Sequence, residues 1–104
     1  MWETCGVILV VADFTVAPEH REQVLAAVAK MLETTRVEPG CARYDFCENA
    51  FAPNRFTFVE EWDSTDALRV HTRTAEMAAF QASTKDLLTD RATAIHEISS
   101  TRRL

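Results

Sequence analysis

The spacing of hydrophobic positions along the chain predicts a mixture of strands and helices. Residues 6–16 are hydrophobic at alternate positions, and the start of this run is hydrophobic on both faces, which is typical of a strand covered on both sides. From Pro18 onward, hydrophobic residues recur every three or four positions, which predicts a helix with one buried stripe. The sequence Glu-Pro-Gly at 38–40 then ends the helix and turns the chain.

The middle and the end of the chain predict three more strands and two short helices. Alternating side chains mark strands at 41–48 and 55–62. An Asp-Ser pair at 63–64 is expected to cap a short helix, and Thr74 a second helix whose buried face extends to Leu88. Residues 92–100 are predicted to form the last strand, in which two isoleucines break the alternation, and a β-bulge is one explanation.

The predicted order, strand–helix–strand–strand–helix–strand, is that of the ferredoxin-like α+β fold with an antiparallel sheet. One domain over residues 1–104 is expected. The helices should cover one face of the sheet, and the other face carries hydrophobic side chains that nothing remains to cover: Val7, Leu9, Val11, Cys47 and Val59. A bare apolar face usually marks an interface, so a homodimer through the open sheet face is predicted.

The net charge of the chain and the length of its hydrophobic runs argue against two classes of partner, nucleic acids and membranes. The net charge is −5, with acids and bases interspersed, so no nucleic-acid partner is expected. No stretch approaches the length that spans a bilayer, and residues 7–12 form a run of only strand length. This run lacks the basic flank and the cleavage site of a secretory signal. We therefore expect a cytoplasmic protein without a membrane partner.

The chain has three cysteines. Cys41 and Cys47 would point to the same face of one strand at a separation of roughly 20 Å. This separation is far beyond the reach of a disulfide. Buried free thiols are therefore the expected state.

His71 is the sharpest candidate for chemistry. It lies three residues beyond Leu68 at the end of the predicted short helix, so it can face inward with that residue. Imidazole is the side chain best suited to moving protons near neutral pH. The alternative is a histidine satisfied by the last carbonyls or the dipole of its helix.

Glu60 is the second candidate, because it shares a strand face with aromatic residues and should look toward the helices. A buried carboxylate is costly unless it is paired or its pKa rises, and a raised pKa suits general acid–base catalysis. The alternatives are an ion pair with Arg43, Arg69 or Arg73, or exposure at the strand end. Glu61, on the opposite face, is expected to contact a second subunit.

The remaining candidates are aromatic. Tyr44, Trp62, Phe58 and Phe80 could line a pocket for a small aromatic substrate between sheet and helices, or simply form the core. The polar tips of Tyr44 and Trp62 need partners, which favours these two as site residues. The histidines show no metal-binding spacing, so no metal site is expected. With two glycines in the chain, no glycine-rich nucleotide loop exists, and no cofactor is expected.

Many of these residues lie in a pattern that resembles the antibiotic biosynthesis monooxygenase family. The pattern consists of Glu-Pro-Gly-Cys-x-x-Tyr-x-Phe at 38–46, Asn-Arg-Phe at 54–56, Glu-Glu-Trp at 60–62, and Ala-Leu at 67–68 followed by His71 and Phe80. The resemblance implies a dimeric α/β barrel with a pocket between sheet and helices, toward which the His71 position faces. Members include oxygenases that act on quinols and polyketide-like phenols without metal or flavin, and enzymes that rearrange sugar-derived signalling molecules.

One branch of the same superfamily degrades haem with an Asn, a Trp and a His. At the corresponding positions this chain has Ala12, His71 and Thr84. Since all three positions depart from that pattern, haem degradation is not expected.

These observations lead to the hypothesis of a homodimeric, cofactor-independent monooxygenase that oxidises a hydroquinone or an electron-rich phenol with O₂. His71, assisted by Glu60, would take the phenolic proton, while Tyr44 and Trp62 would orient the ring. Phe58 and Phe80 would complete the substrate pocket. A non-oxidative isomerase of a small carbonyl compound that uses the same acid–base pair, and a dimeric protein that binds a small ligand without catalysis, are the alternatives.

Overall fold

The computed structural model describes the backbone of residues 2–104 and the side chains from Val7 onward. Along the chain the elements are β1 (Trp2–Val16), a 3₁₀ turn (Pro18–His20), α1 (Arg21–Thr35), β2 (Cys41–Glu48), β3 (Arg55–Trp62), α2 (Thr65–Thr72), α3 (Ala75–Thr84) and β4 (Leu88–Arg102). None of the helices within this described part has the length and hydrophobicity needed to cross a membrane.

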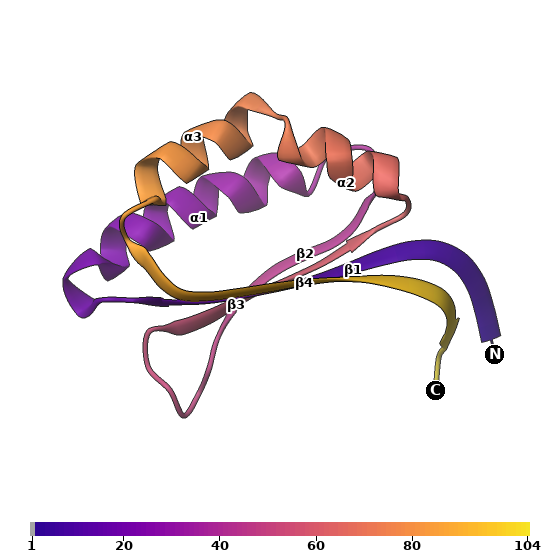
Figure 1. Cartoon of the computed structure of the whole chain (residues 1–104), viewed down its shortest axis with the longest axis horizontal. Coiled ribbons are helices and arrows are strands. Elements are labelled where there is room, and N and C mark those ends of the chain that lie inside the picture. Colours follow the sequence, from indigo (N-terminus) through magenta and orange to yellow (C-terminus); the bar gives the residue numbers. More distant parts are fainter. Residues whose placement is uncertain (1) are drawn as a thin grey trace.

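The four strands form one antiparallel sheet in the order β2-β3-β1-β4. All three helices lie on one face of this sheet, as Figure 1 shows, and the two ends of the chain lie close together at one end of the β1–β4 ribbon. The predicted ferredoxin-like α+β architecture is therefore confirmed.

The core lies between the sheet and the helices because the strands place one set of alternate side chains there. On β3 this set is Phe56, Phe58, Glu60 and Trp62, and all four are buried, as the alternation predicts. The buried stripe of α1 packs on the same layer with Val24, Val28 and Met31.

Two predicted boundaries in the last third of the chain are wrong. α3 ends at Thr84, so its buried face does not extend to Leu88, which instead begins β4. Pairing with β1 explains the difference, because the backbone of β4 is hydrogen-bonded to β1 from Leu88 onward and this overrides the helical spacing. The first strand also starts earlier than predicted, at Trp2.

No β-bulge separates the two isoleucines of β4. Ile95 lies opposite Val10 and Ile98 opposite Val7 in a continuous register, so they simply face opposite sides of the sheet. The register shifts of this strand pair lie elsewhere, next to Val7 and between Asp13 and Thr15 of β1. The proposed explanation for the broken alternation was therefore wrong.

The sheet face away from the helices is left open within residues 2–104 (Figure 1). Val7, Leu9, Val11 and Val59 are only partly buried there. Cys47 on the same face is exposed in the single chain, contrary to the expectation of a buried thiol, because no described residue of this chain covers the face. Cys41 and Cys47 are both free thiols, and the side chain of Cys5 lies outside the described residues.

Candidate active site

A cavity of about 220 Å³ lies between the sheet and the helices α2 and α3. Its wall includes five of the residues singled out from the sequence: Tyr44, Phe58, Glu60, His71 and Phe80. A cavity of ~150 Å³ is enough to hold benzene, so this one has room for a single substituted aromatic ring. Trp62 is not part of the wall, because it is fully buried behind His71.

His71 is positioned by the start of its helix. The Ser64 side chain caps α2 by accepting a hydrogen bond of 3.0 Å from the Ala67 backbone N–H. At the other end of this short helix His71 turns inward and is only 2% exposed. Its ring lies 4.7 Å from the Trp62 ring, centroid to centroid, and 5.6 Å edge-on from the Tyr44 ring. The imidazole is thus held between two aromatic side chains.

Glu38 sets the protonation pattern of this imidazole. Its Oε2 lies 3.0 Å from His71 Nδ1, and the carboxylate can only accept a hydrogen bond, so Nδ1 carries the hydrogen. In the neutral ring the lone pair is then on Nε2, which leaves that nitrogen free to act as a base. The partner of Nδ1 is thus a carboxylate and not a helix carbonyl, although His71 lies in the last turn of α2, where the helix dipole favours a positive charge.

The turn at Gly40 brings Glu38 to His71. Gly40 has φ 85°, and its carbonyl accepts a 2.9 Å hydrogen bond from the backbone N–H of Asp63. A Cβ at this position would lie 2.5 Å from the Ala67 Cβ and 2.6 Å from Asp63 Oδ1. Only glycine fits both the backbone angle and the space. The end of α1 can therefore approach the start of α2 closely.

Glu60 is held by a hydrogen bond and pairs with none of the described basic side chains. Its Oε1 accepts a 2.9 Å hydrogen bond from Trp62 Nε1. Burial is the largest effect on the Glu60 carboxyl and raises its pKa. The hydrogen bond from Trp62 and the charge of His71 lower this pKa, whereas the charge of Glu38 raises it further. The carboxyl therefore keeps its proton to a higher pH than an ordinary glutamate.

The expected arginine partners of Glu60 are engaged elsewhere. Arg43 pairs with Asp45 and Glu61 on the open face, and Arg69 pairs with Asp66 on α2. Arg73 makes no ion pair with any described side chain. The alternative of an ion pair with one of these arginines is wrong for Glu60, because the described partner of its carboxylate is the indole N–H of Trp62.

Tyr44 adds a neutral hydroxyl to this cluster. Burial, and next the charge of Glu60, raise the pKa of the Tyr44 phenol far above its usual value. Beside it lies the buried Thr35 hydroxyl, whose hydrogen bond with the phenol acts against this rise of the pKa. One oxygen of Glu38, Oε1, is buried without a hydrogen-bond partner among the described residues. The cluster thus contains a polar atom whose hydrogen-bonding capacity is not filled.

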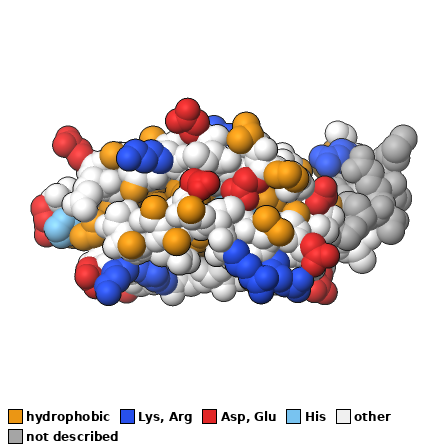
Figure 2. Space-filling model, turned by 90° about the horizontal axis from the view of Figure 1, so that it is seen from above, with side chains coloured by type: hydrophobic (Ala, Val, Ile, Leu, Met, Phe, Trp, Pro, Cys, Tyr) orange, Lys and Arg blue, Asp and Glu red, His pale blue; other side chains and the backbone are white. Residues whose placement is uncertain are grey.

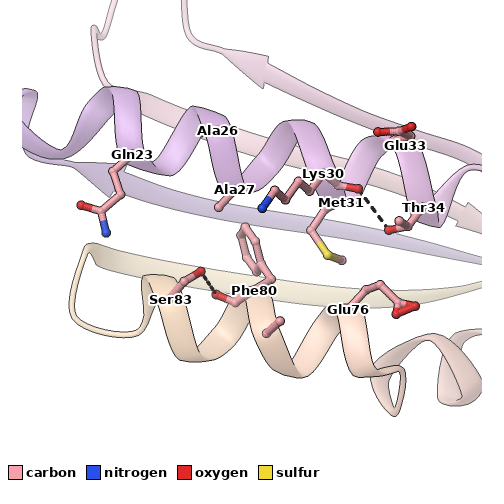
Figure 3. Close-up of a pocket in the computed structure, with 11 residues that line it drawn as sticks. Gln23, Ala26, Ala27, Lys30, Met31, Glu33, Thr34, Glu76, Phe80 and Ser83 are labelled. Carbon is pink, nitrogen blue, oxygen red and sulfur yellow. Dashed lines mark hydrogen bonds between the residues drawn. The ribbon is translucent and has the colours of Figure 1, made fainter.

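Phe80 separates the cavity from a second hollow on the surface. It projects from α3 toward α1, and it lines both the inner cavity and a groove of about 500 Å³ between these helices (Figure 3). The groove is bordered by small and charged side chains such as Ala26, Lys30 and Glu76. Seen from above the helices, hydrophobic atoms show between the charged ones (Figure 2). Phe80 therefore limits the size of the inner cavity on this side.

Two residues of the site escaped sequence analysis. Glu38 was interpreted only as part of a turn, although it belongs to the motif at 38–46 and its acidic side chain precedes a Pro-Gly pair. Arg91 was given no role, because it lies in a strand whose start was misplaced. Among the described residues no three or more potential metal ligands come together.

The fold and the cavity define a small α+β domain that encloses a pocket between its sheet and its helices. The sequence model of the family described as antibiotic biosynthesis monooxygenase matches residues 7–83, and the chain belongs to this family. The match includes Glu38, Tyr44, Glu60, His71 and Phe80.

Two relatives carry names that state an activity. The Bacillus subtilis (strain 168) protein named “Putative monooxygenase YcnE” is 35% identical over 81 residues, which cover 78% of this chain and 85% of that protein. The Escherichia coli (strain K12) protein named “Probable quinol monooxygenase YgiN” is 28% identical over 88 residues, which cover 75% and 85%. The family and these names indicate a monooxygenase.

Solved structures show the same fold. The structure of Rv0793 from Mycobacterium tuberculosis has a TM-score of 0.82 at 28% identity and covers 88% of this chain and 94% of that one. The structure of a protein described as a “putative antibiotic biosynthesis monooxygenase” from Deinococcus radiodurans has a TM-score of 0.87 at 21% identity and covers 93% of this chain and 97% of that one. At this lower identity the likeness concerns the fold alone.

Proposed function

We propose that the chain is a cofactor-independent monooxygenase that oxidises a hydroquinone or an electron-rich phenol with O₂. The observation that carries this proposal is the buried His71, whose Nδ1 is bound to Glu38 and whose ring lines an aromatic cavity of single-ring size. The pairing of a carboxylate with one imidazole nitrogen leaves the other nitrogen as a base. A hydroquinone fits this arrangement because, once deprotonated, it supplies the electrons for oxygen itself.

The first step is removal of a proton. Nε2 of His71 accepts the phenolic proton, and the Glu38 carboxylate stabilises the resulting imidazolium through the Nδ1–H contact. The neutral phenol of Tyr44 offers an O–H to a substrate oxygen. Trp62 acts from behind, since it packs against the His71 ring and holds Glu60.

The oxygen step follows from the phenolate. One electron passes from the phenolate to O₂. The ring radical and the superoxide then combine at the ring carbon ortho to the oxidised oxygen and give a peroxide. Loss of the ring hydrogen as a proton and cleavage of the O–O bond then form a carbonyl and water. A hydroquinone plus O₂ thereby becomes a hydroxylated quinone plus water. The proton for the departing oxygen comes from the imidazolium of His71, assisted by the Glu60 carboxyl, whose pKa is raised by burial.

Oxygen consumption by metal-free protein tests this proposal. Uptake against a panel of hydroquinones and phenols should require the protein, and the product should gain one oxygen atom from ¹⁸O₂. If turnover proceeds under argon, the protein is an isomerase. If a ligand binds but nothing turns over in air, it is a binding protein. Either result contradicts the oxygenase.

The quinol specificity draws support from the name of the Escherichia coli relative and from the size of the cavity. One ring with its substituents fits, whereas a fused polycyclic substrate would require Phe80 to move.

Association through the open sheet face is part of the proposal. Val7, Leu9, Val11 and Val59 form an apolar surface there that a second copy can cover, and in a dimer Glu61 would lie at the contact.

The mass in solution tests the dimer. Light scattering should give twice the 11.7 kDa of one chain, and Val59→Arg should lower the mass to that of a monomer because it places a charge in the apolar contact. Val37→Arg is the matched control, since Val37 is 82% exposed and lies off the sheet. A dimer that survives Val59→Arg would place the interface elsewhere.

A further inference from the structure

Arg91 brings a positive charge to the rim of the cavity. Among the described side chains that line it, Arg91 is the one arginine or lysine, and it is exposed to solvent. It lies near the start of β4, just after the turn that follows α3. Any ligand that enters from this side meets its guanidinium.

The guanidinium is fixed in place by the main chain. Arg91 Nε donates to the Leu88 carbonyl at 3.2 Å, and Nη2 donates to the Lys85 carbonyl at 3.0 Å. A guanidinium has five N–H groups, so these two bonds leave further donors free. Capping of the turn carbonyls explains these two hydrogen bonds, but it uses only some of the N–H donors of the guanidinium.

Arg91 forms no ion pair with any carboxylate that the structure describes. Arg21, Arg36, Arg43 and Arg69 each form an ion pair with a carboxylate, whereas no described carboxylate lies within ion-pair distance of Arg91. This is notable in a chain with a net charge of −5, where acids outnumber bases. A fixed, unpaired guanidinium next to a cavity is a recognition group for a carboxylate.

Asp13 and Glu60, the two acidic residues among the described ones that line the cavity, are each engaged in a hydrogen bond within the protein. The Glu60 carboxyl accepts the Trp62 N–H and keeps its proton more strongly than usual. Asp13, which also borders the cavity, accepts a short hydrogen bond from the Thr57 hydroxyl. The rest of the wall is largely apolar, as expected of a site that holds a ring.

We propose that the substrate is a single-ring hydroquinone or phenol that carries a carboxylate, and that Arg91 binds this carboxylate at the rim of the cavity. The ring then extends inward along Phe58 and Phe80 toward His71. The identity of the ring rests on the proposed oxygenase function. The recognition of an anion does not, because it needs no oxygen and no proton transfer.

Equilibrium binding under argon tests the proposal with two probes of nearly the same shape, of which only one carries a negative charge. Calorimetry should show that 2,5-dihydroxybenzoate binds at least about tenfold more tightly than 2,5-dihydroxybenzamide, as expected for a hydrogen-bonded charge pair. Arg91→Gln should remove this preference, because it weakens binding of the carboxylate and leaves binding of the amide unchanged. Arg73→Gln removes the same charge from a residue outside the cavity and should keep the preference.

The outcomes separate this proposal from the oxygenase. Equal binding of both probes by the native protein, equal weakening of both by Arg91→Gln, or binding of neither would overturn the role of Arg91. The native protein gives a second measurement, since added salt should reduce the preference for the carboxylate. A preference for the carboxylate without oxygen uptake would support the role of Arg91 and contradict the oxygenase. Oxygen uptake without such a preference would support the oxygenase and contradict the role of Arg91.

Discussion

Replacing His71 with glutamine is expected to lower kcat/KM for hydroquinone oxidation by at least about 100-fold, the usual contribution of a general base. The side chain is buried between Trp62 and Tyr44, and glutamine fills most of its volume without offering a basic nitrogen. The loss should appear in kcat more than in KM, because the imidazole acts in proton transfer and the aromatic wall still binds the ring. Initial rates of oxygen uptake measure the effect.

Two further variants sharpen the interpretation. His20→Gln makes the same exchange in the 3₁₀ turn, outside the cavity, and should retain native rates. The rate of the Glu38→Gln variant should lie between those of His71→Gln and His20→Gln. The glutamine amide can bind Nδ1 either as donor or as acceptor, so it no longer fixes one tautomer of the imidazole. Circular dichroism confirms folding of each variant. A folded His71→Gln protein with native activity would remove His71 from the mechanism.

Gly40→Ala is expected to lower the free energy of unfolding by at least about 2 kcal/mol, because it combines a strained backbone angle with overpacking. The new methyl group would meet the Ala67 Cβ at 2.5 Å and the Asp63 carboxylate at 2.6 Å, while φ stays at 85°. For a domain of this size the melting temperature should fall by roughly 10 °C. Urea denaturation monitored by tryptophan fluorescence measures the change.

A second substitution separates the two causes. Ala67→Gly alone costs about 1 kcal/mol as a helix substitution, but in the double variant it removes the closest contact. The double variant should therefore be more stable than the sum of the single losses predicts, and the loss that remains reports the strain at Gly40. If Gly40→Ala melts within a degree of the native protein, the turn is not confined as described.

The elements with short-range signals were predictable from the sequence. The strands at 41–48 and 55–62 match the structure in their bounds, because their alternation and the residues that flank them agree. Ser64 and Thr74 cap their helices as expected, since a hydroxyl before a helix has a local role. The end of α3 was not predictable, because Leu88 fits a helical stripe as well as a strand and only pairing with β1 decides between them.

The site was predictable where a single residue type implied its chemistry. His71, Glu60 and Tyr44 stood out as polar groups among apolar ones, and the structure brings them together. Glu38 could not be found in this way, because its contact with His71 spans 33 positions and depends on the close approach at Gly40. Catalysis by these residues remains a prediction that the variants above test.

The edge strand β4 supplies one side of the cavity through Arg91 and Ile95, yet it lies beyond residue 83, where the family match ends. Glu38 and His71 both lie inside the match. In the proposal above, recognition of the carboxylate by Arg91 and the proton chemistry of Glu38 and His71 therefore lie in separate stretches of the chain. On this proposal, exchanging this one strand with that of a relative is expected to change the preference for an anionic ligand while Glu38 and His71 stay in place, so β4 could diversify without disturbing the acid–base pair.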